Sequence, residues 1–584
     1  MVSCPVMYEF AQQSTYLESS TAREDDILPY IGWVVIRTAK SQFANVLTKT
    51  NSPKTKKACR RGGNSFRRLP FCARDGRIGE NGRECFCAPQ SSPDGVVRVK
   101  GMERKQLLGN MLWRFLERCG AQGVTFVVSI VLARLLDPAA YGTLALVTAF
   151  TTILEAFVDG GFGNALIQKQ DADSLDFSSV FYFNIIMCLG LYAGLFAAAP
   201  AIASFFGRQE LTALVRFCGL TLVISGVKNV QHAYVARNML FKRFFFATLG
   251  GTLTAAAVGI FLAYRGWGVW ALAVQHIVNL LVDTLILWFT VGWRPKWRFS
   301  FARLKGLLMF GWKLLASSLL DRVYTELRSL VIGKRYSSGD LAFYNRGRQF
   351  PNFVVSNVNS AIDSVLFPTL SRQQEDRDAL QRMTAAAIRT SVFLMAPLML
   401  GLAACAEPLV RLVLTEKWLP CVFYLRICCI TLLFYPIHTA NLNALKALGR
   451  SDLFLKLECI KKGAGLALLL STMGFGVKAI ALSGLLQSVI AQIVNAWPNR
   501  KLLHYGYGQQ LRDILPSLAL AAVMAVAVYM LQFLNLPDIL LLCLQVAAGA
   551  AIYMAGAVLL KLPGYVCLRQ SLQNILTGRE KDHA

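Results

Sequence analysis

The sequence predicts an all-α polytopic membrane protein with about 14 transmembrane helices: two six-helix lobes related by a parallel repeat, followed by two C-terminal helices. Three observations predict this fold class. The 584 residues are 55% hydrophobic and only 16% charged, whereas soluble domains are about 25% charged. From about residue 107 onward, apolar stretches recur that are long enough to cross a bilayer as helices. The two halves also resemble each other at a fixed offset, as described below.

Residues 1–101 differ from the rest, because they are polar, irregular and rich in Arg, Lys, Gly and Ser. One explanation is a disordered basic extension. The other, which we favour, is a start codon assigned too early, with Met102 as the true start, because "MERKQLLGNMLWRF" supplies a short basic flank before the first span. Cys59, Cys72, Cys85 and Cys87 have spacings of twelve, twelve and one intervening residues, which are not those of paired zinc ligands, and the five histidines form no spaced cluster. We expect no metal and no cofactor.

The membrane part divides into 102–299 (first lobe, helices 1–6), 300–500 (second lobe, helices 7–12) and 501–584 (helices 13 and 14 and a tail). The candidate spans, in order, are 111–133, 142–167, 180–205, 211–236, 244–264, 268–292, 307–333, 341–368, 385–406, 421–447, 457–474, 477–497, 514–534 and 538–561.

The loops between these spans predict the orientation of the chain. Loops after even-numbered helices contain seventeen Lys and Arg residues, against eight after odd-numbered helices when Lys478 at the beginning of the twelfth span is included. Basic loops stay in the cytoplasm, so we place both ends of the membrane part there, in a bacterial inner membrane. The formal net charge of +27 then has a membrane explanation, and we predict no nucleic-acid partner.

An internal repeat relates the halves at an offset of 200 residues. "VLARLLDPAAYGTLAL" begins at Val131, and "VIGKRYSSGDLAFYNR" begins at Val331. Each reads as a helix end, a basic residue, a short turn and a new helix. Because basic loops fall on matching sides, the halves have the same orientation, as in transporters whose substrate site lies between parallel repeats.

Several stretches resemble a known family when they are taken in order: "LARLLDPAAYGTLALVTAF", "DGGFGNALIQK", "FYFN", "GWGVWAL", "LAFYNRGRQFP", "VLFPTLSRQ" and "EKW". From about residue 105 to 565 the chain resembles the Wzx-type polysaccharide transport proteins, the lipid-linked oligosaccharide flippases of the MOP superfamily. The resemblance implies a V-shaped pair of six-helix lobes. It also implies alternating access that carries an undecaprenyl-pyrophosphate-linked sugar unit from the inner to the outer leaflet.

Ionisable residues within the predicted spans suggest a cationic central cavity, since such residues are costly in lipid and usually face a bundle interior. Arginine can donate paired hydrogen bonds to phosphate oxygens. The candidate substrate-binding residues are Arg118, Arg322, Arg346, Arg328, Arg114 and Arg348. The alternative is that these arginines snorkel to headgroups or form structural pairs with carboxylates.

Among these residues we prefer Arg346 over Arg348. Arg346 fits the family pattern of tyrosine, asparagine, arginine and alanine after the turn, whereas Gly347 and Arg348 depart from it. Two residues that are two positions apart on a helix point about 160° apart, so both cannot face one cavity squarely. The first half has Leu146 and Thr148 at the matching positions, so these charges belong to the second lobe alone.

The expected function is therefore a flippase for lipid-linked oligosaccharides that feeds exopolysaccharide, O-antigen or lipopolysaccharide synthesis. Its partners would be the lipid-linked substrate, membrane lipids and polysaccharide polymerase and export proteins. The alternatives are another MOP-type exporter, such as a multidrug antiporter or a peptidoglycan-precursor flippase, and a membrane polymerase or ligase. An enzyme of that kind is disfavoured, because the longest predicted external loop, about 407–420, is short. We do not expect an enzyme.

Overall fold

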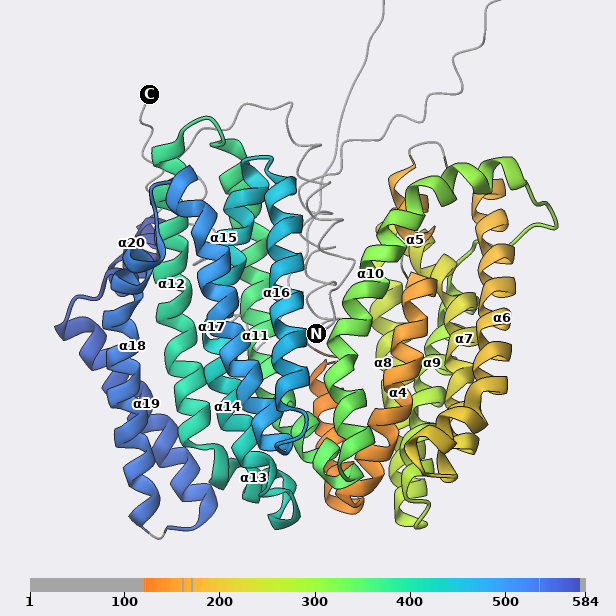
Figure 1. Ribbon diagram of the computed structural model, residues 1–584, viewed down its shortest axis with the longest axis horizontal. Helices are drawn as coiled ribbons and strands as arrows, with labels where there is room; N and C mark the ends of the chain where they lie inside the picture. Colours follow the sequence, from red (N-terminus) through yellow and green to blue (C-terminus); the bar gives the residue numbers. More distant parts are fainter. Residues whose placement is uncertain (1–119, 121, 160–161, 170–171, 535, 578–584) are drawn as a thin grey trace, which may run out of the picture. The chain divides into compact units, whose positions relative to one another are not determined.

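The computed structural model describes residues 120, 122–159, 162–169, 172–534 and 536–577. The predicted extension 1–101, its proposed end at Met102, and Arg114 and Arg118 lie outside these residues. All regular structure in the described ranges is helical (Figure 1). A first helix spans Gln122–Leu135. The others are α4 (Pro138–Asp159), α5 (Phe162–Gln168), α6 (Ser174–Phe206), α7 (Glu210–Arg237), α8 (Phe241–Tyr264), α9 (Val269–Thr290), α10 (Phe301–Arg335), α11 (Ser338–Arg372), α12 (Arg377–Ala404), α13 (Ala406–Leu414), η3 (Glu416–Trp418), α14 (Cys421–Leu433), α15 (Tyr435–Ala447), α16 (Ser451–Thr472), α17 (Val477–Leu502), α18 (Tyr507–Met530), η4 (Leu531–Leu534), α19 (Asp538–Leu559) and α20 (Pro563–Thr577).

Ten candidate membrane spans occur in the described part of the chain, judged by length and apolar composition. Helices α10, α11 and α16 fall outside that set, although α10 and α11 each have 35 residues, or about 50 Å of helix. They carry ionisable side chains along their length, such as Glu326, Arg348 and Lys461. Of the first predicted span, only Gln122–Leu135 is described. The multi-pass helical class is confirmed, and the count of fourteen stays a prediction.

The described helices pack in two groups, and one apolar core, which includes Leu146 of α4 and Tyr424 of α14, contains residues of both groups. Helices α4–α9 contact one another, and α11–α20 form the second set of contacts. Three helices cross this division: α11, whose most extensive contact is with α4, the first helix and α10. Ala133 of the first helix belongs to the same core as Trp418 and α12 of the second group. In return, α10 makes its most extensive contact with α4 of the first group.

The contacts of α10 concern the predicted boundary between the two lobes. The boundary at 299/300 lies just before α10, but α10 packs against α4, α5 and α6 more than against α11. The beginning of α10 runs across the ends of α5 and α6, and its remainder runs beside α4 (Figure 1). The assignment of α10 to the second lobe therefore remains a prediction, because α10 joins the two groups.

An ion pair inside the first group provides a stability test. Lys228 of α7 and Asp283 of α9 form a salt bridge, and Asp283 is buried. We expect Asp283→Ala to lower the unfolding free energy by about 3 kcal/mol, because it leaves an uncompensated charge. The double variant Lys228→Met/Asp283→Leu should recover most of the loss. Unfolding of the purified protein in detergent measures both, and a double variant as unstable as Asp283→Ala would contradict the expectation.

Candidate substrate-binding site

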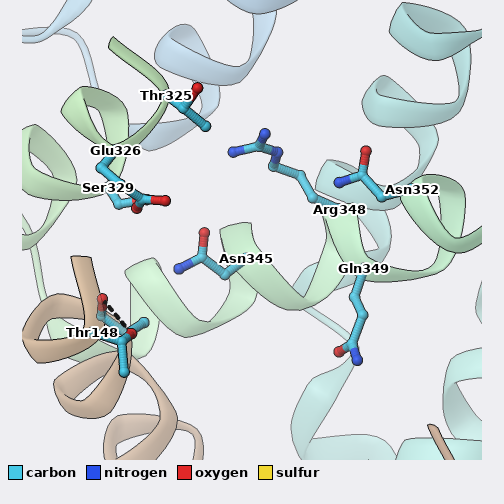
Figure 2. A pocket seen from close by; sticks show the side chains of 9 residues that line it. Thr148, Thr325, Glu326, Ser329, Asn345, Arg348, Gln349 and Asn352 are labelled. Atoms are coloured by element: carbon cyan, nitrogen blue, oxygen red, sulfur yellow. Dashed lines mark hydrogen bonds between the residues drawn. The ribbon is translucent and has the colours of Figure 1, made fainter. Parts of the chain in front are cut away.

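A polar cavity lies where α4, α10 and α11 meet. Its volume is about 260 Å³, and its polar lining side chains are drawn in Figure 2. The lining residues are Ala145 and Thr148 of α4; Thr325, Glu326 and Ser329 of α10; and Asn345, Arg348, Gln349 and Asn352 of α11. The cavity therefore lies between a helix of the first half and the helix that matches it in the second.

Matching positions of the two halves face this cavity. Ala145 and Asn345 both line it, and so do Thr148 and Arg348. Each pair is separated by the 200 residues of the predicted repeat. Parallel repeats in transporters place the substrate site at the interface between them. The arrangement thus supports the repeat as a real relation between α4 and α11.

Arg348 supplies the positive charge of the cavity. Its side chain extends from α11 toward Thr325 of α10, and the Glu326 carboxylate also lines the cavity (Figure 2). The guanidinium lies 5.3 Å from the ring centroid of Tyr344. None of the ion pairs among the described residues includes Arg348 or Glu326. Arg348 can therefore bind an anionic group without first breaking a salt bridge.

Two local features hold the first turns of α11 in place. Ser337 caps the helix: its hydroxyl accepts from the backbone N–H of Asp340 at 3.0 Å, and the Asp340 carboxylate accepts from the Ser337 N–H at 3.3 Å. Gly347 lets α11 approach α14, because a Cβ there would lie 2.7 Å from the Cys421 carbonyl oxygen. The glycine that departs from the family pattern is therefore required by helix packing.

Arg346 lies in a different environment from Arg348. It is 6% exposed, and its guanidinium lies 4.6 Å from the ring centroid of Tyr141 and 5.0 Å from that of Trp418. It donates to Gln349 and, at 3.5 Å, to the Ser129 carbonyl. It is not among the residues that line the cavity. The placement of the two residues therefore does not support the preference for Arg346. Aromatic rings enclose Arg346, whereas Arg348 lines the cavity.

The other predicted arginines are also away from the cavity wall. Arg328 donates to the side-chain oxygen of Gln487 on α17, and Gln487 donates to Tyr324. Arg322 is half-buried on α10 and does not line the cavity. With Arg114 and Arg118 outside the described residues, Arg348 is the member of the predicted set that the structure places in the cavity. A binding role for each of the six stays a prediction.

Sequence reasoning missed the neutral polar residues of the site. Asn345, Gln349 and Asn352 are spaced by four and three residues, which puts them on one face of α11 together with Arg348. Polar residues at this helical spacing inside a long predicted span could have indicated the site. Amide side chains are unfavourable in lipid, so a face of the helix that carries them is expected to line a cavity. Among the described residues, no group of three or more His, Cys, Asp and Glu side chains could hold a metal ion.

The fold and the cavity define a class: a multi-pass helical membrane protein with a polar cavity between matching helices, which is the architecture of a transporter. The chain belongs to the polysaccharide biosynthesis protein family, whose model matches residues 131–423, half of the chain. This confirms the family predicted from the sequence. The family is one of membrane transporters and not of enzymes.

Individual relatives and solved structures agree with this assignment. The chain is 27% identical to the succinoglycan biosynthesis transport protein ExoT of Rhizobium meliloti over 54% of its own length and 64% of that protein's length. It is 23% identical to the lipopolysaccharide biosynthesis protein WzxC of Escherichia coli over 61% of the chain and 73% of WzxC. Its fold is similar to the inward closed conformation of the lipid II flippase MurJ, with a TM-score of 0.64, 14% identity, and coverage of 78% of this chain and 98% of MurJ.

Proposed function

We propose that the chain is a flippase that moves undecaprenyl-pyrophosphate-linked oligosaccharide units across the bacterial inner membrane. The observation that carries this proposal is Arg348 in the cavity between α4, α10 and α11. A guanidinium binds phosphate or carboxylate oxygens through paired hydrogen bonds. The amides of Asn345, Gln349 and Asn352 offer both donors and acceptors to sugar hydroxyl groups. Such a cavity fits a headgroup that is both anionic and rich in hydroxyl groups.

Alternating access is the mechanism that fits this position. The cavity lies at the contact of α4 with α10 and α11, so movement of one helix group against the other would change its opening to either side. The headgroup would stay solvated by Arg348 and the surrounding amides, while the prenyl tail stays in lipid. The names of ExoT and WzxC support export for exopolysaccharide or lipopolysaccharide synthesis. O-antigen is a further surface polysaccharide whose units such a flippase would carry.

The orientation follows from the basic loops, with both ends of the membrane part in the cytoplasm. In this orientation the turn between α10 and α11 faces outward, so Arg348 lies in the outer part of the membrane. Polymerase and export proteins at the outer face would take up the translocated unit.

Another MOP-type exporter is the second candidate function. The fold is shared with the lipid II flippase and with a multidrug resistance transporter of the MATE family, with a TM-score of 0.52, so the fold alone does not separate a peptidoglycan-precursor flippase or a multidrug antiporter from the proposed function. The lining of the cavity favours an anionic saccharide over a cationic drug, because Arg348 would repel a cation. A membrane polymerase or ligase is less supported, since the relative ExoT is named as a transport protein.

Deletion of the gene in the bacterium that carries it tests the proposal. We expect lipid-linked oligosaccharide to accumulate where a membrane-impermeant glycosidase cannot reach it in intact spheroplasts, and surface polysaccharide to be lost. The wild-type gene should restore both. Normal outer-leaflet oligosaccharide in the deletion strain would refute the flippase function. Altered drug resistance or a block in peptidoglycan synthesis with normal surface polysaccharide would favour the second candidate.

A further inference from the structure

The segment that leads into α10, residues 293–312, has a surface that the transport cavity does not explain. Its sequence is "WRPKWRFSFARLKGLLMFGW", with five Lys and Arg residues. The chain contains no Asp or Glu between Asp283 and Asp321. Aromatic and basic residues therefore alternate here without a local negative charge.

One side of this segment is firmly held by the first helix group. Leu304 and Leu307 lie in an apolar core with Trp293. The backbone N–H of Lys296 donates to the Ser178 hydroxyl at 3.0 Å, and the N–H of Ser300 donates to the Ser179 hydroxyl, also at 3.0 Å. The segment is thus fixed along α6, so its outward face is defined by the fold.

Two ion pairs at the same place fix the start of α10. Arg303 donates to the Asp173 carboxylate at 2.6 Å and lies 3.7 Å from Asp176. The backbone N–H of Asp176 and the Arg303 guanidinium lower the pKa of Asp173 to about 2. Asp173 is therefore charged at neutral pH, and the contact with Arg303 is formed there. Arg303 is engaged and is not part of the outward face.

The outward face is apolar and cationic. Trp297 is 95% exposed and Phe301 is 65% exposed, and Phe299, Met309 and Trp312 are exposed as well. Lys296, Arg298 and Lys305 are also exposed, and none of the ion pairs among the described residues includes them. A tryptophan is usually well buried. Exposed aromatics beside unpaired basic residues are the pattern of a segment that lies in the headgroup region of a bilayer.

We propose that this face, defined by Lys296, Trp297, Arg298, Phe301 and Lys305, binds the headgroups of anionic phospholipids. The three basic side chains would contact the lipid phosphates, and the aromatic rings would enter the boundary between headgroups and acyl chains. Charge complementarity selects anionic over zwitterionic lipid. Because α10 carries Glu326 and contacts α4 and α11 at the cavity, lipid bound at its first turns would act directly on a helix of the transport site.

Binding of soluble short-chain lipids to the purified full-length protein tests the proposal. The probes are dioctanoyl phosphatidylglycerol, dioctanoyl phosphatidylcholine and glycerol 3-phosphate. We expect phosphatidylglycerol to bind much more tightly than the other two. Each basic residue near an anionic lipid surface contributes roughly fivefold in affinity. The variant Lys296→Ser/Arg298→Ser/Lys305→Ser should therefore weaken phosphatidylglycerol binding by about a hundredfold.

Two control variants separate lipid binding from misfolding. The charge-retaining variant Lys296→Arg/Arg298→Lys/Lys305→Arg should bind phosphatidylglycerol as the wild type does. Arg265→Ser removes an exposed arginine at the loop between α8 and α9 and should also bind normally. Equal binding of phosphatidylcholine, equal binding of glycerol 3-phosphate, or unchanged binding by the triple serine variant would each overturn the proposal. None of these outcomes depends on the transported substrate.

Discussion

Replacement of Arg348 by alanine is expected to stop export of surface polysaccharide while leaving the protein in the membrane at its normal level. The guanidinium is the positive charge of the cavity. A hydrogen bond to a charged group is worth about 1.5–3 kcal/mol, which corresponds to a loss of roughly ten- to hundredfold in affinity for an anionic headgroup. The measurement is surface polysaccharide in a deletion strain that carries the variant, normalised to the amount of protein in the membrane.

Three further variants make this result specific. Arg348→Lys should retain part of the export, because the charge stays but the paired donors are lost. Asn352→Ala should reduce export less than Arg348→Ala, since a neutral group is removed from the same cavity. Arg265→Ala, which removes an arginine that stacks on Phe261 at 5.2 Å, should export normally. Full export by Arg348→Ala would exclude this cavity as the headgroup site.

Trp418→Ala is expected to cause the largest loss of stability. The side chain is fully buried, and its ring contacts Tyr141, Phe343 and the Arg346 guanidinium. Truncation of a buried tryptophan costs about 3–5 kcal/mol, and here it would also expose Arg346 to an unfilled space. We expect a large fall in the Tm of the detergent-purified protein and less protein in the membrane. A Tm close to that of the wild type would contradict this account of the contact.

Trp418→Phe separates the ring from its hydrogen bond. The indole N–H donates to the Ala133 carbonyl at 2.9 Å, and phenylalanine would keep most of the packing but leave this oxygen unpaired. We expect an intermediate loss of about 1–3 kcal/mol. If Trp418→Phe is as unstable as Trp418→Ala, then the hydrogen bond, which both variants lose, and not the ring packing determines the stability at this position.

The segment "EKW" explains why these losses should be large. The last carbonyls of a helix have no partners within it. Lys417 donates to the carbonyls of Arg134 and Leu136 at 2.9 and 2.7 Å, next to the Trp418 bond to Ala133. In return, Arg134 donates to the last carbonyls of α13, including that of Val413 at 2.9 Å. The end of the first helix is therefore capped by residues of η3, and the end of α13 by Arg134 of the first helix, which fastens the first helix to the second group.

The sequence predicted the helical class because long apolar runs and few charges leave no other stable structure in lipid. It predicted the polar face of α11 only in part. Arg346 and Arg348 are two residues apart, and the sequence shows that they point in different directions. Which direction faces the cavity depends on the packing of α11 against α14, which Gly347 permits. The preference for Arg346 rested on the family pattern and not on packing.

The sequence by itself determined the membrane class, the positions of most helices and the family, while the repeat at an offset of 200 residues stays a prediction. These properties depend on composition and spacing, which are local and readable along the chain. Only the tertiary structure decided that Arg346 lies between Tyr141 and Trp418, that Arg348 faces a cavity, and that α10 packs beside α4. The physical reason is that the environment of a side chain is set by helices far apart in the sequence, so identical charges two residues apart meet aromatic rings in one case and a polar cavity in the other.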